Sequence, residues 1–586
     1  MIRQELVKLL HDAVRQLSVE EGKVGFGDIA LERPENLEHG DYSTNAALVL
    51  ASKTKKAPRE VGELLLAFLE KHKPKTIERV EVAGAGFINF FLSKETLAEE
   101  LELAVKEGEK YGTSKSSKGK KVMVEFTDPN PFKEFHVGHL YSNAVGECLS
   151  RLMEAQGAEV KRANYQGDVG MHVAKAVWGM ERKLAEEATK LQELEKLSLP
   201  ERVHFLGQVY AKGAAAFEQD KGAAEEIAEL NKKIFEGATE AAELYEKGKA
   251  WSLEYFERIY ERLGTRFEFS YFESEVGERG KKLVEEGLRK NIFQKSEGAV
   301  VFPGEEYGLH SRVFVNSQGL PTYEAKELGL APRKYEDFPY DLSIIVTGKE
   351  VVDYFKVVLK ALELLAPELR KKTVHISHGM VRLPSGKLSS RTGKVVAGEE
   401  LLEEIKGRAR EIMAQSEGGL SLQEKEDVAE MVAVGAVKYS LLRIALGKDI
   451  IFDTEKSLSL EGDSGPYLQY TAARCKSILR KANEQGISLA KPRDILGLAK
   501  EESALLRMLY RFPEVVEDAA ENFAPHAVCG FLMETAQLFN SFYHAHPVLK
   551  AEREELRDFR LLLVAATANV LSNGLRLLGV KAPERM

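Results

Sequence analysis

The first 112 residues show two kinds of hydrophobic pattern, helical spacing at either end and strand-like runs between. Charged and apolar residues alternate at helical spacing from Ile2 to Leu17, and an acidic helix is expected from Lys94 to Tyr111. Between them the pattern predicts, in chain order, a loop at Gly40–Asn45, a helix at 46–51, and two strands within 79–92 on either side of Gly84-Ala85-Gly86. These elements predict a small α+β domain over residues 1–112, followed by a polar, basic linker at 114–121.

Strand and helix patterns alternate from residue 121 onward, which is typical of a parallel α/β sheet. A strand at 121–126 leads to a helix at 138–156 and a second strand at 159–164. The charged, alanine-rich sequence at about 181–261 has no strand pattern and predicts a helical insertion. Further strands are predicted, in chain order, at 299–302, 313–316, 343–347 and 373–377, and the chain after 399 is predicted to be helical.

The predicted fold class is therefore α/β, with a parallel-sheet domain at 118–398 and a helical region at 399–586. A chain of 586 residues is long enough for these domains and the small N-terminal one. No apolar run is long enough to span a membrane, and three distant cysteines predict free thiols in a reducing cytoplasm. The net charge of −9 argues weakly against nucleic-acid binding, but an acidic protein can still carry a basic stripe.

The sequence His136-Val137-Gly138-His139 follows a predicted strand and opens a predicted helix. A helix N-terminus presents unpaired N–H groups and a positive dipole end, both of which favour phosphate. The two histidines face the same side of the first turn and can donate hydrogen bonds to a phosphate under attack, while Gly138 lets a nucleotide approach the backbone. A pair of surface histidines is the alternative, and these four residues alone favour neither interpretation.

A second candidate phosphate-binding segment is Gly386–Gly393, with the sequence GKLSSRTG. Its glycines, serines and basic residues predict a mobile loop, which can close over a triphosphate and neutralise the leaving pyrophosphate. Taken alone, such a segment is more often an ordinary basic surface loop.

Together the two segments resemble the HIGH and KMSKS motifs of class I aminoacyl-tRNA synthetases, in the arginine-specific form in which Pro-Asn and a lysine precede the histidines. Here those residues are Pro129, Asn130 and Lys133, and the resemblance covers essentially the whole chain. Ser390 stands where the second motif usually has a lysine, and Lys133 is expected to compensate. The resemblance implies the catalytic residues His136, His139, Lys133 and Lys387, and the ATP-binding residues His136, Gly138, His139, Lys387, Ser389, Ser390 and Arg391.

An arginine substrate needs buried carboxylates, because a guanidinium keeps its charge and pairs with them in bidentate geometry. Glu125 ends the first predicted strand of the sheet, at the edge where α/β proteins bind ligands. Tyr323 and Glu327, one helical turn apart, resemble the family's tyrosine and aspartate, although Glu327 is one methylene longer. The residues implied to bind arginine are Glu125, Asn130, Asp168, Tyr323 and Glu327.

Two flanking regions are candidate RNA-binding surfaces. Residues 467–481 predict a helix with clustered basic side chains, suited to a phosphate backbone, although a solvated basic face explains them equally well. This helix resembles the start of the family's all-helical anticodon-binding domain, here at about 456–586. The strand around Phe87 resembles one that binds a base in the tRNA elbow, which implies this role for the domain at 1–112. The residues implied to bind tRNA are Phe87, Asn89, Tyr467, Arg474, Lys476 and Met586.

The resemblance as a whole implies an enzyme with a Rossmann-type catalytic domain that joins L-arginine to tRNA(Arg), using ATP with Mg²⁺ and no prosthetic group or structural metal. It also implies a monomer in the cytoplasm, with no membrane partner. Three alternatives stay open: a class I synthetase for another amino acid, a nucleotidylyltransferase with an HxGH motif, and a non-enzymatic RNA-binding protein. The candidate carboxylates argue against the first, the two RNA-binding flanks against the second, and the intact HVGH motif against the third.

Overall fold

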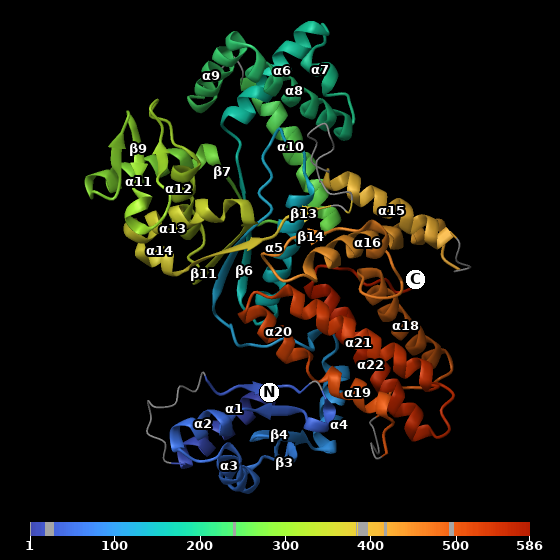
Figure 1. The fold of residues 1–586 in the computed structure, drawn as a ribbon. Coiled ribbons are helices and arrows are strands. Elements are labelled where there is room, and N and C mark those ends of the chain that lie inside the picture. Colours follow the sequence, from blue (N-terminus) through green and yellow to red (C-terminus); the bar gives the residue numbers. More distant parts are fainter. Residues whose placement is uncertain are drawn as a thin grey trace.

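The computed structural model describes residues 2–17, 28–34, 36–237, 242–382, 384, 397–414, 419–490 and 497–586. Figure 1 shows a central parallel sheet with a helical insertion above it, a small domain below it and helices packed along one side. None of the helices in these ranges has the length and apolar character needed to cross a bilayer. The α/β fold class predicted from the sequence is confirmed.

The N-terminal unit is an antiparallel sheet with strand order β1-β2-β4-β3, covered by helices. The two strands predicted around Gly84-Ala85-Gly86 are confirmed as β3 and β4. The loop predicted at Gly40–Asn45 is wrong in part, because β2 pairs there with β4. The elements are α1 (Ile2–Gln16), β1 (Leu31–Glu32), β2 (Tyr42–Thr44), α2 (Ala46–Thr54), α3 (Pro58–His72), β3 (Ile77–Ala83), β4 (Phe87–Leu92) and α4 (Lys94–Glu107).

The central sheet has the strand order β12-β11-β5-β6-β7, and each neighbouring pair is parallel. The chain moves outward from β5 to β7 and then returns to the other side of β5 with β11, so the order reverses between β5 and β11. In open α/β sheets ligands bind at such a reversal, beyond the carboxyl ends of the strands. The strands are β5 (Lys121–Glu125), β6 (Glu159–Gln166), β7 (Phe269–Phe272), β11 (Leu342–Gly348) and β12 (Thr373–His378). Helix α5 (Val137–Ala155) packs against β5, β6, β11 and β12.

The helical insertion lies between β6 and β7 and has its own apolar core, which includes Phe205 and Trp251. Its helices are α6 (Met171–Glu186), α7 (Leu191–Leu194), α8 (Leu199–Gln219), α9 (Lys221–Phe235) and α10 (Ala242–Leu263). The last of them, α10, leads back to the sheet (Figure 1).

A second insertion into the central sheet lies between β7 and β11. The strands predicted at 299–302 and 313–316 belong to it rather than to the central sheet, because they form an antiparallel sheet with order β10-β9-β8 around Phe293, Phe302 and Phe314. Its elements are α11 (Glu273–Arg289), β8 (Gln294–Ser296), β9 (Ala299–Phe302), β10 (Arg312–Val315) and α12 (Tyr323–Asp337). Helices α13 (Val352–Leu365) and α14 (Pro367–Lys371) then connect β11 to β12.

The chain after β12 is mostly helical, as predicted, apart from a short parallel pair of strands, β13 and β14. Helices α15, α16, α20, α21 and α22 contact α5, so the C-terminal region packs directly on the domain that contains the central sheet. The elements are β13 (Val381–Arg382), α15 (Gly398–Ala414), α16 (Leu422–Leu442), β14 (Ile450–Ile451), α17 (Thr454–Ser457), α18 (Gly465–Glu484), α19 (Lys500–Leu509), α20 (Phe512–Glu521), α21 (Pro525–Ala545) and α22 (Glu554–Leu577).

A polar network joins the N-terminal unit to α19 and α20. The Arg33 guanidinium lies between the rings of Tyr42 and Tyr510, 4.5 and 4.8 Å from their centroids. It donates a hydrogen bond of 2.7 Å to Glu514, which also accepts one of 2.6 Å from the Tyr42 hydroxyl. Because Tyr42 and Glu514 are buried, this network fixes the small domain against the C-terminal helices.

Candidate active site

The HVGH segment begins α5 at the reversal point of the sheet. His136 precedes the helix in an extended conformation, and its backbone N–H donates a 3.1 Å hydrogen bond to Nδ1 of His139. The two imidazole rings stack with a centroid separation of 3.6 Å. The loop before them contains three non-glycine residues with positive φ, Thr127, Asp128 and Phe132. Such conformations persist only where the surroundings enforce them, and they cluster at functional sites.

The surroundings of both histidines favour the neutral imidazole. Burial lowers the pKa of His136, and burial together with neighbouring His136 lowers the pKa of His139 well below its usual value. Because Nδ1 of His139 accepts a hydrogen bond, the neutral ring carries its proton on Nε2 and can donate from there. Nδ1 of His136 is buried without a hydrogen-bond partner among the described residues.

Lys133 and Gly138 lie beside this pair. Lys133 is half-buried, and burial lowers the pKa of its ammonium, while the charge of Glu273 opposes that shift. A Cβ on Gly138 would lie 3.0 Å from the His136 ring, so a larger residue there would displace the imidazole.

The second segment predicted to bind phosphate, with Lys387, Ser389, Ser390 and Arg391, lies outside the described residues. The chain that follows it is placed at the HVGH segment: Ala397 forms a β-bridge with His136, and the N–H of Gly398 donates a 2.7 Å hydrogen bond to the carbonyl of Phe135. The strand that precedes it, β13, pairs with β14.

Four acidic side chains gather at the carboxyl ends of β5 and β7. Glu125 and Glu273 are buried, and each pairs with a buried lysine, Glu125 with Lys334 at 2.5 Å and Glu273 with Lys326 at 2.6 Å. The other two members are Asp128 and Glu327. The cluster holds four carboxyl groups but only two lysine partners among the described residues, so a bound cation would stabilise the ionised form of the other two carboxyls.

Glu327 forms no ion pair with a described residue, although the charge of Lys334 partly favours its ionised form. Burial and the negative charge of Glu125 raise its pKa to about 8, and no described residue donates a hydrogen bond to it. The same two causes raise the pKa of Asp128 well above its usual value, although Asp128 accepts a 2.8 Å hydrogen bond from the N–H of Tyr165. The Tyr165 hydroxyl faces these carboxylates without a partner among the described residues.

The remaining residues predicted for the pocket differ in their surroundings. Asn130 accepts a 2.8 Å hydrogen bond from the N–H of Gly167. Tyr323 is 53% exposed at the start of α12, where the ammonium of Lys326 lies 4.9 Å from its ring centroid. Asp168 is fully buried and accepts hydrogen bonds from Tyr245, Lys249 and Ser274.

Sequence analysis did not identify Glu273, Lys326 and Lys334 as parts of this cluster. A signal for Glu273 was present, because the alternating aromatic residues Phe267, Phe269 and Tyr271 mark a strand that ends just before it. The lysines gave no such signal, since a buried partner in a distant segment leaves no local pattern.

The predicted elbow-binding residues lie on β4. Phe87 is 43% exposed at the start of the strand, as a stacking residue must be. Asn89 is buried, and its Oδ1 accepts a 2.7 Å hydrogen bond from the Ser43 hydroxyl.

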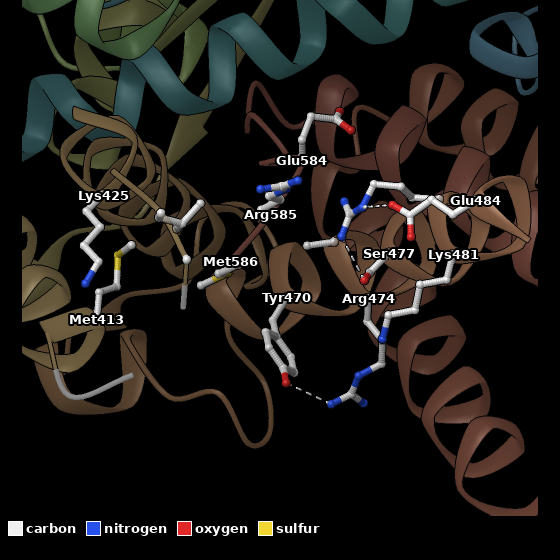
Figure 2. A pocket seen from close by; sticks show the side chains of 14 residues that line it. Met413, Lys425, Tyr470, Arg474, Ser477, Lys481, Glu484, Glu584, Arg585 and Met586 are labelled. Carbon is white, nitrogen blue, oxygen red and sulfur yellow. Dashed lines mark hydrogen bonds and ion pairs between the residues drawn. The ribbon is translucent and has the colours of Figure 1, made fainter. Parts of the chain in front are cut away.

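A cavity of about 530 Å³ lies between α15, α16, α18 and the C-terminal tail (Figure 2). Arg474 and Met586, both predicted to bind tRNA, line it. Its other basic residues are Lys425, Arg480, Lys481 and Arg585. The aromatic residue Tyr470 also lines it, and the Tyr470 hydroxyl accepts a 3.1 Å hydrogen bond from Arg474. Cationic side chains around an aromatic ring are typical of sites for unpaired bases.

Tyr467 and Lys476 do not line this cavity. The Tyr467 hydroxyl accepts a hydrogen bond from Asn540, and Lys476 pairs with Glu584 at 2.5 Å. Lys476 instead borders a neighbouring cavity of about 610 Å³.

Residues 100–454 match the family model "tRNA synthetases class I (R), catalytic domain", and residues 468–586 match the "DALR anticodon binding domain". The fold and the site are thus those of a class I aminoacyl-tRNA synthetase. Residues 2–92 match the "Arginyl tRNA synthetase N terminal domain". The chain belongs to the arginyl-tRNA synthetase family.

The proteins most relevant to this assignment align with nearly the whole length of the chain. An arginine–tRNA ligase of Clostridium perfringens is 36% identical over 557 residues, which cover 95% of this chain and 96% of that one. One of Thermococcus kodakarensis is 35% identical over 640 aligned positions, covering 100% and 98%. Among solved structures, Thermus thermophilus arginyl-tRNA synthetase superposes with a TM-score of 0.82 at 27% identity, covering 100% of both chains.

Proposed function

We propose that this chain is an arginine–tRNA ligase whose two chemical steps take place where the HVGH segment meets the acidic cluster. In the first step L-arginine and ATP form arginyl-adenylate and pyrophosphate. In the second step a hydroxyl of the 3′-terminal adenosine of tRNA(Arg) attacks the arginyl carbonyl carbon, and AMP leaves. The observation that supports this most is the placement of the HVGH helix start and of a four-carboxyl cluster with two lysine partners at one reversal point of a parallel sheet.

The acidic cluster forms the arginine end of the site. A guanidinium offers five donors in a fixed plane, which can pair with carboxylates in bidentate geometry. We assign this contact to Glu125, Tyr323 and Glu327, with Asn130 at the edge of the cluster. We add Glu273, because its carboxylate is buried beside the same residues and only one of its oxygens is taken by Lys326.

The HVGH segment forms the ATP end. A carboxylate oxygen of arginine attacks the α-phosphorus, and the bond to the bridging oxygen of pyrophosphate breaks. His136 and His139 donate hydrogen bonds to the α-phosphate as its charge changes, and the helix N-terminus adds its dipole. Lys133 and the segment with Lys387, Ser389, Ser390 and Arg391 neutralise the leaving pyrophosphate, and Mg²⁺ enters with the ATP.

Both flanking domains bind the tRNA in this proposal. Phe87 contacts the elbow, and the buried Asn89 supports the same strand, while Tyr467, Arg474, Lys476 and Met586 belong to the anticodon-binding surface. The basic cavity beside Arg474 supports the second assignment. We further propose a monomer in the cytoplasm, where the three buried free cysteines stay reduced.

Pyrophosphate exchange into ATP, measured for each amino acid with and without tRNA, tests the function. We expect exchange with L-arginine and transfer of arginine to tRNA(Arg). Exchange with another amino acid would favour a different class I synthetase. Adenylyl transfer to a small molecule without any amino acid would favour a nucleotidylyltransferase.

A further inference from the structure

One face of helix α10 touches both halves of the proposed site. Residues Tyr245, Gly248, Lys249 and Ser252 lie at positions i, i+3, i+4 and i+7, so they form one stripe of the helix. The Ser252 hydroxyl accepts a 3.0 Å hydrogen bond from the N–H of Phe132, in the loop before the HVGH segment. A Cβ on Gly248 would lie 2.1 Å from the Phe132 ring, so the helix is in close contact with that loop.

The other end of this stripe reaches Asp168, at the carboxyl end of β6. Oδ2 of Asp168 accepts hydrogen bonds from Lys249 Nζ at 2.7 Å, from the Ser274 hydroxyl at 2.7 Å and from the Tyr245 hydroxyl at 3.1 Å. Oδ1 accepts one of 3.0 Å from the N–H of Ser274. Each carboxylate oxygen has two lone-pair positions, so the three donors occupy Oδ2 fully, while Oδ1 keeps one position beside its bond to Ser274. Because Asp168 is fully buried and its Oδ2 is saturated, it is placed to hold these neighbours together and not to pair in bidentate geometry with a substrate.

Asp168 acts on the pocket through its neighbour. Ser274 directly follows Glu273, and both lie in the first turn of α11. Two of the four hydrogen bonds therefore hold the first turn of α11, which carries the Glu273 carboxylate into the acidic cluster. The Lys249 ammonium also lies 4.0 Å from the ring centroid of Phe272, the last residue of β7, so one cation contacts both the carboxylate and the strand before Glu273.

We propose that Asp168 and Lys249 are positioning residues that fix the Glu273 carboxylate and join the helical insertion to the arginine pocket, and that Asp168 is not itself an arginine ligand. This inference rests on the proposed function, because it takes the acidic cluster to be the arginine site. With these two residues, the insertion helps to hold the pocket in place, since α10 is the helix that returns from the insertion to the sheet. A displacement of the Glu273 carboxylate by about 1 Å is enough to weaken a bidentate contact with the guanidinium.

Arginine-dependent pyrophosphate exchange with the full chain, at saturating tRNA, tests the proposal. Lys249→Met and Asp168→Asn should each raise KM for arginine about tenfold, while kcat and KM for ATP stay within about twofold. The double variant should match either single variant at about tenfold instead of about a hundredfold, because the two residues serve one contact. Lys249→Arg keeps the charge and should restore KM to within about threefold of the parent chain.

Lys247→Met is the matched control. Lys247 lies on the same helix but pairs with Glu195 in the insertion, at an exposed position, so its loss should leave KM unchanged. The proposal is overturned if Asp168→Asn raises KM for arginine while Lys249→Met does not, or if the two effects multiply. It is also overturned if kcat and KM for ATP change as much as KM for arginine, as general loosening would cause. Lack of arginine-dependent exchange in the parent chain would instead overturn the proposed function.

Discussion

In the proposed arginine site, Glu327 is the residue whose charge changes near neutral pH. Burial and the negative charge of Glu125 raise its pKa to about 8, so at pH 7 it is mostly a neutral acid. A guanidinium pairs with the carboxylate and not with the acid. We therefore expect kcat/KM for arginine to rise about tenfold per pH unit up to pH 8 and to level off above it.

The profile of kcat/KM against pH measures this, because it reports groups of the free enzyme. Glu327→Gln should abolish the inflection near pH 8 and leave a uniformly low value, since the amide neither titrates nor carries charge. An unchanged inflection in that variant would assign it to another group.

The positive charge of the amino acid substrate can be tested separately from its shape. Citrulline has nearly the shape of arginine but no positive charge, so it would leave the pocket carboxylates uncompensated. Above pH 8, where Glu327 is ionised, we expect arginine to be preferred over citrulline by about 10⁴ in kcat/KM for exchange. Comparable activation of the two amino acids would rule out the acidic cluster as the arginine site.

The histidine pair gives a third prediction. His136→Ala or His139→Ala should each lower kcat by about 10²–10³ with little change in KM, because a preorganised donor acts on the transition state. Steady-state exchange kinetics separate the two constants. A variant with normal kcat would remove that histidine from the mechanism.

At the scale of elements, the chain around the HVGH helix start collects the proposed phosphate ligands. Lys133 comes from the loop before α5, and Ala397, which follows the second motif, bridges to His136. Since that motif has Ser390 where a lysine is usual, we expect Lys133→Ala to slow adenylate formation more than it weakens arginine binding. Lys133→Ala combined with Ser390→Lys should recover part of the rate, because both cations would serve the same phosphates. Single-turnover rates of the two variants decide this, and an unaltered rate in Lys133→Ala would exclude compensation.

Elements could be predicted from the sequence where local pattern and tertiary role agree. Strands β3 and β4 carry a glycine turn and apolar runs, and the structure confirms them. Strand β2 was missed because Gly40–Asn45 is rich in turn-forming residues, and pairing of Tyr42 with Phe90 overrides that local preference. The same limit applies to the site. Glu125 could be named from the end of its predicted strand and Glu327 from a motif, whereas the Lys334–Glu125 pair joins side chains 209 residues apart.

At the scale of the molecule, the Arg33 network holds the N-terminal domain against the C-terminal helices. If both domains bind one tRNA, their fixed spacing contributes to affinity. Arg33→Ala leaves buried Glu514 without its cation, so we expect KM for tRNA in aminoacylation to rise about tenfold and arginine exchange at saturating tRNA to change little.

Arg3→Ala is the matched control for this interface. Arg3 pairs with Asp518 at 2.5 Å, but the two side chains are 36% and 45% exposed, and exposed pairs contribute little. Its KM for tRNA should stay within about twofold of the parent value. Equal effects of the two substitutions would mean that the network does not set the spacing of the domains.

The Arg33 network also constrains how the protein is made. Arg33 precedes Glu514 by 481 residues, so a ribosome adding about 5–20 residues per second completes Glu514 about 24–96 s after Arg33. During that interval the N-terminal domain leaves the exit tunnel with its docking surface, including Tyr42, uncovered. Synthesis of this chain thus creates a period in which the surface is open to chaperones or to another nascent copy, and it ends only when helix α20 has emerged.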